Sequence, residues 1–130
     1  MDNIESYYLR GRMENAWNPH QGDKKRVLCI CSAGLLRSPT IAWILSNDPW
    51  NYNTRAAGSE VEYALIQVND VLLYWAQELV FANRRNLQSV AKRFALDKHT
   101  IHTLDLPDRF VFRDPELVEI ARKQLTEAGV

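Results

Sequence analysis

The sequence predicts a three-layer α/β domain, in which helices cover both faces of a four-stranded parallel sheet. Two observations carry this prediction. Short apolar segments of strand length alternate along the chain with segments of helical periodicity. The first apolar segment, residues 27–31, contains no polar side chain except its thiols, which is typical of a strand buried on both faces of a parallel sheet.

We predict the strands and helices from these patterns and from helix-capping residues. Ser38-Pro39 and Asp114-Pro115 each indicate an N-cap followed by a proline in the first helical turn, and Gly129 follows the end of the last helix. The predicted strands cover residues 27–31, 53–57, 79–82 and 100–104. The predicted helices cover residues 38–45, 59–67, 70–77, 83–94 and 115–128.

Length and composition set the limits of the function classes. One domain is expected from 130 residues, over residues 26–130, preceded by an extension at residues 1–25 with a short helix near residues 3–13 and a loop. The 16 basic and 16 acidic residues balance, which argues against a nucleic-acid binder. No apolar stretch is long enough to span a membrane, and the N-terminus lacks the pattern of a signal peptide. We expect a cytoplasmic protein whose two cysteines, Cys29 and Cys31, are free thiols.

The segment from Cys31 to Pro39 carries the chemistry. Cys31 ends a buried strand, five residues follow, and Arg37 and Ser38 come at the start of a helix. Five residues can curl so that their N–H groups and the helix N-terminus point at one anion, while arginine grips two of its oxygens. We therefore predict a phosphate cradle with the Cys31 thiolate as nucleophile and with Ser38 as a hydrogen-bond donor to its sulfur.

The residues between the cysteine and the arginine are predicted to bind substrate through their backbone. Gly34 permits a left-handed or close-approach conformation, and Cys29 is expected to be a core residue on the same side of the strand as Cys31. The pair Arg84-Arg85 is interpreted as solvated surface, with a contact to an acidic partner as the alternative. The predicted substrate-binding residues of this loop are Ser32, Ala33, Gly34, Leu35, Leu36 and Ser38.

This loop resembles the active-site loop of the low-molecular-weight protein tyrosine phosphatases, in particular of the small predicted tyrosine phosphatases of bacteria and phages. Three further stretches resemble the family in the same order, over residues 26–128 in all. They are Ala56-Ala57-Gly58-Ser59, Ala82-Asn83-Arg84-Arg85-Asn86-Leu87 and Pro107-Asp108-Arg109-Phe110. The resemblance implies the flavodoxin-like strand order 2-1-3-4 and hydrolysis of phosphotyrosine through a phosphocysteine intermediate, without a cofactor or metal.

The chain also departs from the family pattern at four positions. Gly34 replaces a mid-loop asparagine, and Leu36 replaces a second cysteine, so only Cys29 could trap an oxidised Cys31. Asn83 stands where the family has an aspartate that braces the loop, and Arg109 replaces the proline of the acid loop.

Phosphate-ester cleavage needs a proton donor for the leaving oxygen, and three aspartates follow the fourth predicted strand. Asp114 precedes Pro115 and is expected to cap a helix, and Asp105 ends the strand. Asp108 lies in mid-loop beside Phe110 and a second phenylalanine, which could contact an aryl ring, so we predict that Asp108 is the general acid and keep Asp105 as the alternative.

The predicted function is that of a cysteine-dependent phosphatase acting on a phosphorylated protein or a small phosphate ester. Two alternatives stay open: a module that binds phosphate or phosphopeptide without turnover, and a phosphatase for a small phosphorylated metabolite.

Overall fold

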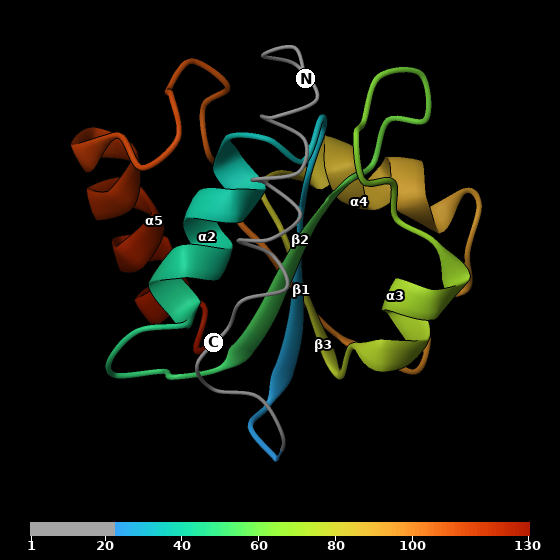
Figure 1. Ribbon diagram of the computed structural model, residues 1–130, viewed down its shortest axis with the longest axis horizontal. Helices are drawn as coiled ribbons and strands as arrows, with labels where there is room; N and C mark the ends of the chain where they lie inside the picture. Colours follow the sequence, from blue (N-terminus) through green and yellow to red (C-terminus); the bar gives the residue numbers. More distant parts are fainter. Residues whose placement is uncertain (1–22) are drawn as a thin grey trace, which may run out of the picture.

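Four parallel strands form one sheet in the order β2-β1-β3-β4. Figure 1 labels the first three of them in the chain, β1, β2 and β3. The computed structural model describes residues 23–130. The strands are β1 (Arg26–Cys31), β2 (Asn53–Gly58), β3 (Glu78–Phe81) and β4 (Thr100–Thr103). The helices in this part of the chain are α2 (Arg37–Leu45), α3 (Asp70–Trp75), α4 (Arg84–Ala91) and α5 (Pro115–Glu127). The predicted three-layer fold and its strand order are confirmed.

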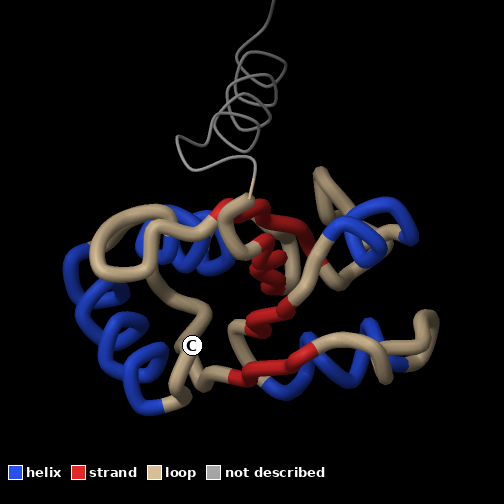
Figure 2. The backbone as a smooth tube through the Cα atoms, turned by 90° about the horizontal axis from the view of Figure 1, so that it is seen from below, coloured by secondary structure: helices blue, strands red, loops and turns tan. Residues whose placement is uncertain are grey.

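Helices cover both faces of the sheet, as Figure 2 shows by placing the strands between two groups of helices. Successive side chains of β1 point to opposite faces, and this divides the core in two. Val27, Cys29 and Cys31 pack with buried residues of α2 and α5, whereas Leu28 and Ile30 pack with residues around α3 and α4. Both faces of β1 are therefore apolar, which explains the uninterrupted apolar run of its sequence.

The carboxyl ends of the strands share one edge of the sheet. In the register of the strands Cys31 lies beside Gly58, and Phe81 lies beside Thr103. The order of the strands reverses at β1, since the chain moves to β2 on one side and then to β3 on the other. A crevice at the carboxyl edge of such a point is the usual ligand site of open α/β sheets.

The opposite, amino edge holds a small ionic cluster. Glu78 contacts His102 Nε2 through Oε1 and Lys25 Nζ through Oε2, each at 2.7 Å. Burial acts to raise the pKa of Glu78, but the hydrogen bonds and positive charges of Lys25 and His102 outweigh it, so this pKa lies below its ordinary value. The hydrogen bond to Glu78 also raises the pKa of Lys25.

Three of the predicted helices differ from the structure. Residues 59–67 form turns rather than a helix, because the chain bends back there and Gln67 makes a parallel bridge with Gly58 at the end of β2. The helices predicted at 70–77 and 83–94 end earlier, at Trp75 and Ala91.

The ends of the last helix agree with the prediction. Asp114 is the N-cap of α5 and accepts a hydrogen bond from the Glu116 N–H, and Gly129 has a φ of +73° beyond its last turn. The helix predicted near residues 3–13 lies outside the described residues, as does nearly all of the extension predicted at residues 1–25.

Candidate active site

The cradle, defined as residues 31–38, connects the end of β1 to the start of α2 at the carboxyl edge of the sheet. Cys31 is 2% exposed. Its thiol donates a hydrogen bond to Ser38 Oγ over 3.2 Å, and the Gly34 N–H donates to its Sγ over 3.3 Å. The Ser38 hydroxyl donates in turn to the Ala57 carbonyl oxygen at 3.3 Å. Two hydrogen-bonding groups of the cradle thus lie against the sulfur.

Ser38 does not cap α2 as predicted. The helix begins one residue earlier, at Arg37, and its N-cap position is Leu36, which makes no side-chain cap. The Ser38 side chain is fully buried and lies beside the sulfur. This position fits the predicted contact with Cys31 and corrects the predicted cap.

Gly34 gives the cradle its curvature. Its φ is +76°, a left-handed conformation that glycine adopts without strain. A Cβ atom at this position would lie 2.8 Å from Ala57 C and 2.8 Å from Gly58 N. The loop therefore packs directly on the backbone at the end of β2, and the hydrogen bond from the Ser59 N–H to the Cys31 carbonyl oxygen, at 2.8 Å, fixes the two segments together.

Arg37 is 2% exposed, and its guanidinium lies between the loop and the segment that follows β4. One terminal nitrogen donates to the Leu106 carbonyl oxygen at 3.2 Å, and the other donates to Ser32 Oγ at 3.3 Å. Nε lies 3.4 Å from Asp108 Oδ1, within the range of an ion pair but without the geometry of a hydrogen bond. Arg37 therefore keeps a buried N–H that no acceptor within residues 23–130 satisfies.

Backbone donors in the cradle are also left over. Within the described part of the chain, no hydrogen bond uses the N–H groups of Ala33, Leu35, Leu36 and Arg37. Ala33, Leu35 and Leu36 are half-buried. Because a helix N-terminus carries partial positive charge as well, this segment collects donors and positive charge at one place, which suits an anion.

A network of neutral side chains supports the cradle from below. Asn86, fully buried in the first turn of α4, donates from Nδ2 to Ser32 Oγ and to Ser59 Oγ, each at 3.1 Å. Ser32 Oγ thus accepts from both Asn86 and Arg37. The resemblance places Asn83 at the position of the family's bracing aspartate, but Asn83 Oδ1 accepts from the Asn86 N–H and so caps α4.

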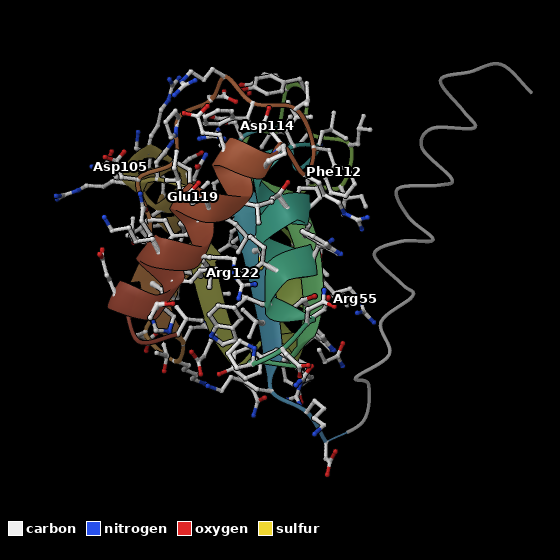
Figure 3. The ribbon with its side chains drawn as sticks, turned by 90° about the vertical axis from the view of Figure 1, so that its left-hand side faces the viewer. Arg55, Asp105, Phe112, Asp114, Glu119 and Arg122 are labelled. Atoms are coloured by element: carbon white, nitrogen blue, oxygen red, sulfur yellow. The ribbon has the colours of Figure 1, made fainter. Side chains whose placement is uncertain are left out.

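The segment after β4 places the three aspartates differently. Asp108 is exposed, with 65% of its side-chain surface accessible, and of the three its carboxylate alone contacts the cradle. The backbone of Asp105 is held by the Gln124 side chain through two hydrogen bonds. Figure 3 shows Asp114 where α5 begins, with Asp105 and Phe112 on either side of the helix. The geometry therefore brings Asp108, and neither Asp105 nor Asp114, to Arg37.

Phe110 does not lie where a substrate ring would meet it. It is 5% exposed and belongs to the core beneath α2 and α5, with the Arg109 guanidinium 4.2 Å from its ring centroid. Phe112 is only partly buried, and the guanidinium of Arg113 covers its ring. The predicted contact between Phe110 and substrate is corrected on this ground, since a side chain packed in the core has no free face.

Cys29 occupies the core as predicted. It is fully buried on the same face of β1 as Cys31, and both cysteines are free. Burial, with a smaller contribution from Cys31, raises the pKa of the Cys29 thiol well above its ordinary range. This thiol therefore stays protonated at neutral pH.

Clustered metal ligands and membrane-spanning helices are both missing from residues 23–130. No group of three or more His, Cys, Asp or Glu side chains in that range is arranged to hold a metal ion, and no helix there has the length and apolarity needed to cross a bilayer. Comparison with protein-family models, with curated proteins and with solved structures found no match to this chain.

Proposed function

We propose that this chain is a cysteine-dependent phosphatase that hydrolyses phosphotyrosine or a similar aryl phosphate through a phosphocysteine intermediate. The observation that supports it most is the set of unsatisfied donors beside one thiol. The N–H groups of four cradle residues and the buried Nε of Arg37 have no acceptor in residues 23–130, and Cys31 lies at the base of the same loop. A phosphoryl group offers the negative oxygens that such donors bind.

In the first step the Cys31 thiolate attacks phosphorus, so that an S–P bond forms as the P–O bond to the aryl group breaks. Arg37 and the cradle N–H groups stabilise the negative charge on the remaining three oxygens. The Ser38 hydroxyl, 3.2 Å from the sulfur, can turn from the Ala57 carbonyl and donate to the sulfur. Asp108 gives its proton to the leaving phenolate oxygen.

In the second step water attacks phosphorus and the S–P bond breaks, which returns the thiolate and releases inorganic phosphate. Asp108, left ionised by the first step, accepts the proton of that water. Its contact with Arg37 Nε at 3.4 Å supports this role, because the carboxylate then reaches the guanidinium that binds the phosphoryl oxygens. A cytoplasmic location, where free thiols stay reduced, belongs to the proposal.

The test compares two cysteines of one strand. Cys31→Ser should abolish the release of phosphate from nitrophenyl phosphate and phosphotyrosine, whereas inorganic phosphate should still raise its melting temperature. Cys29→Ser is the matched control, since it changes the same atom on the same face of β1, two residues away. It should keep turnover and lose about 1–3 kcal/mol of stability from the buried hydroxyl.

Two results would contradict the proposal. Phosphate binding by the unchanged chain without any turnover would identify a binding module instead. Turnover that survives Cys31→Ser would remove Cys31 as the nucleophile. A substrate preference for phosphorylated metabolites over phosphotyrosine would keep the mechanism and change the substrate.

A further inference from the structure

Two arginines begin α4 next to the cradle. Arg84 and Arg85 are both exposed, and they occupy the first two positions of the helix. Asn86, the next residue, donates to Ser32 of the cradle at 3.1 Å. α4 begins just after the carboxyl end of β3, so the pair lies within one helical turn of a side chain that contacts the candidate active site.

The position of these arginines is electrostatically unfavourable within the chain itself. A helix N-terminus carries partial positive charge and favours acidic side chains, yet the first turn of α4 has none. The N-terminus of α2 and the guanidinium of Arg37 add further positive charge at the same edge.

No acid within residues 23–130 pairs with Arg84 or Arg85. Neither Arg84 nor Arg85 forms an ion pair, a side-chain hydrogen bond or a ring contact in that part of the chain. Glu60, which packs against α4, accepts instead from Ser89 at 3.3 Å. Within residues 23–130, the guanidinium groups of Arg84 and Arg85 are therefore open to an acidic ligand.

We propose that Arg84 and Arg85 form a specificity site for acidic residues next to the phosphotyrosine of a protein substrate. The binding of the phosphotyrosine itself rests on the proposed function. The binding of the acidic residues beside it rests on the positive charge at the start of α4. A guanidinium binds a carboxylate with two parallel hydrogen bonds, and two adjacent arginines on one helix turn suit a peptide with more than one acid.

A peptide is favoured over a nucleic acid by the balance of charge. The chain has 16 basic and 16 acidic residues, and the exposed positive charge without partners at this edge is local. A short acidic peptide segment beside the cradle matches a positive surface of this small size, whereas a nucleic-acid backbone needs a longer positive surface.

The experiment compares phosphotyrosine peptides that differ only in their flanks, acidic or neutral. The unchanged chain should show a kcat/KM about two- to tenfold higher for the acidic peptide, as exposed ion pairs provide, and 1 M NaCl should remove this preference. The double variant Arg84→Gln/Arg85→Gln should lose the preference and should keep its turnover of nitrophenyl phosphate, which has no flanks.

A second double variant, Lys92→Gln/Lys98→Gln, is the matched control, because it removes the same charge from exposed positions beyond the C-terminal end of α4. It should retain the preference. Loss of the preference in both variants would indicate net charge alone and overturn the proposal, as would a preference that survives in the arginine variant. A short RNA that competes better than the acidic peptide would also overturn it.

Binding of the same peptides to Cys31→Ser separates the two proposals. An acidic preference in binding that depends on Arg84 and Arg85, together with no turnover of any phosphate ester by the unchanged chain, would refute the phosphatase and leave the specificity site standing. Turnover of nitrophenyl phosphate without any acidic preference would refute the specificity site alone.

Discussion

Replacing Gly34 with alanine tests the cradle at the point where its geometry is tightest. The residue has a φ of +76°, and a Cβ atom there would meet the backbone of Ala57 and Gly58 at 2.8 Å. Both obstacles are backbone atoms in a buried strand, so neither can move aside as a flexible side chain would. The Gly34 N–H also points at Cys31 Sγ, so any shift of the loop changes the contact with the sulfur.

The expected loss has two parts. A left-handed alanine costs about 1–2 kcal/mol, and forcing an extra carbon into a packed site costs about 1–3 kcal/mol, so Gly34→Ala should lose about 2–5 kcal/mol of stability. Gly129→Ala is the control, because its φ of +73° is almost the same and no atom lies within 4 Å of the added carbon. It should lose about 1–2 kcal/mol only. Any stabilisation from a less flexible unfolded chain is common to both variants.

The measurements are urea unfolding and turnover of nitrophenyl phosphate. Turnover by Gly34→Ala should fall about 10²–10³-fold, as expected when a donor to the reacting group is lost, and turnover by Gly129→Ala should stay unchanged. If the two variants lose equal stability and both remain active, then the loop does not press on β2 and its amide is not needed at the sulfur.

Three other substitutions test the acid, the support of the cradle and the distant ionic cluster. Asp108→Asn should lose about 10²–10⁴-fold in turnover of phosphotyrosine, whose leaving group has a pKa of about 10, and far less in turnover of nitrophenyl phosphate. Asp105→Asn should change the turnover of neither substrate. The reverse pattern would make Asp105 the general acid in place of Asp108. Asn86→Ala removes the two hydrogen bonds that Asn86 donates to serine hydroxyl oxygens, and it should lower the free energy of unfolding by about 1–3 kcal/mol. It should also weaken phosphate binding, measured by calorimetry, and unchanged binding would argue against a bracing role for Asn86. The pKa of Glu78 is lowered in the folded chain, so its contribution to stability is present above the ordinary glutamate pKa of about 4.3 and is lost as pH falls through the lower folded value. Urea unfolding at several pH values should show that this pH-dependent part of the free energy of unfolding disappears in Glu78→Gln. It should persist in Glu119→Gln, an exposed control.

The parts of the fold that sequence could predict are those in which a local pattern and the tertiary environment agree. Residues 27–31 are apolar throughout because both faces of β1 are covered, and this one strand fixes where the cradle begins. Asp114 and Pro115 start α5 as their types predict. The cradle's Cys31 and Arg37 were likewise predictable, since their spacing and their place between a strand and a helix are both in the sequence.

The parts that sequence could not predict depend on contacts between distant segments. Ser38 has the right type for a cap, but the sulfur of Cys31 and the carbonyl of Ala57 occupy its hydroxyl. Asn83 and Asn86 are the same residue type, so their identity does not tell which of them contacts the loop. The packing of α4 on the loop decides that Asn86 reaches Ser32. The spacing of Asn86 nevertheless carries a signal. Asn86 follows the asparagine cap by three residues, and this places it in the first turn of the helix.

The choice of neutral partners for Arg37 explains why this buried charge suits a ligand site better than a structural ion pair. Its two terminal nitrogens bond to a carbonyl and to a hydroxyl, and these oxygens satisfy donors without cancelling charge. The one carboxylate in contact, that of Asp108, is exposed and lacks hydrogen-bond geometry. A buried acid in its place would neutralise the guanidinium permanently. With neutral partners inside and an exposed acid outside, the charge of Arg37 stays available, and an anion can replace Asp108 at Nε without unpairing any buried acid.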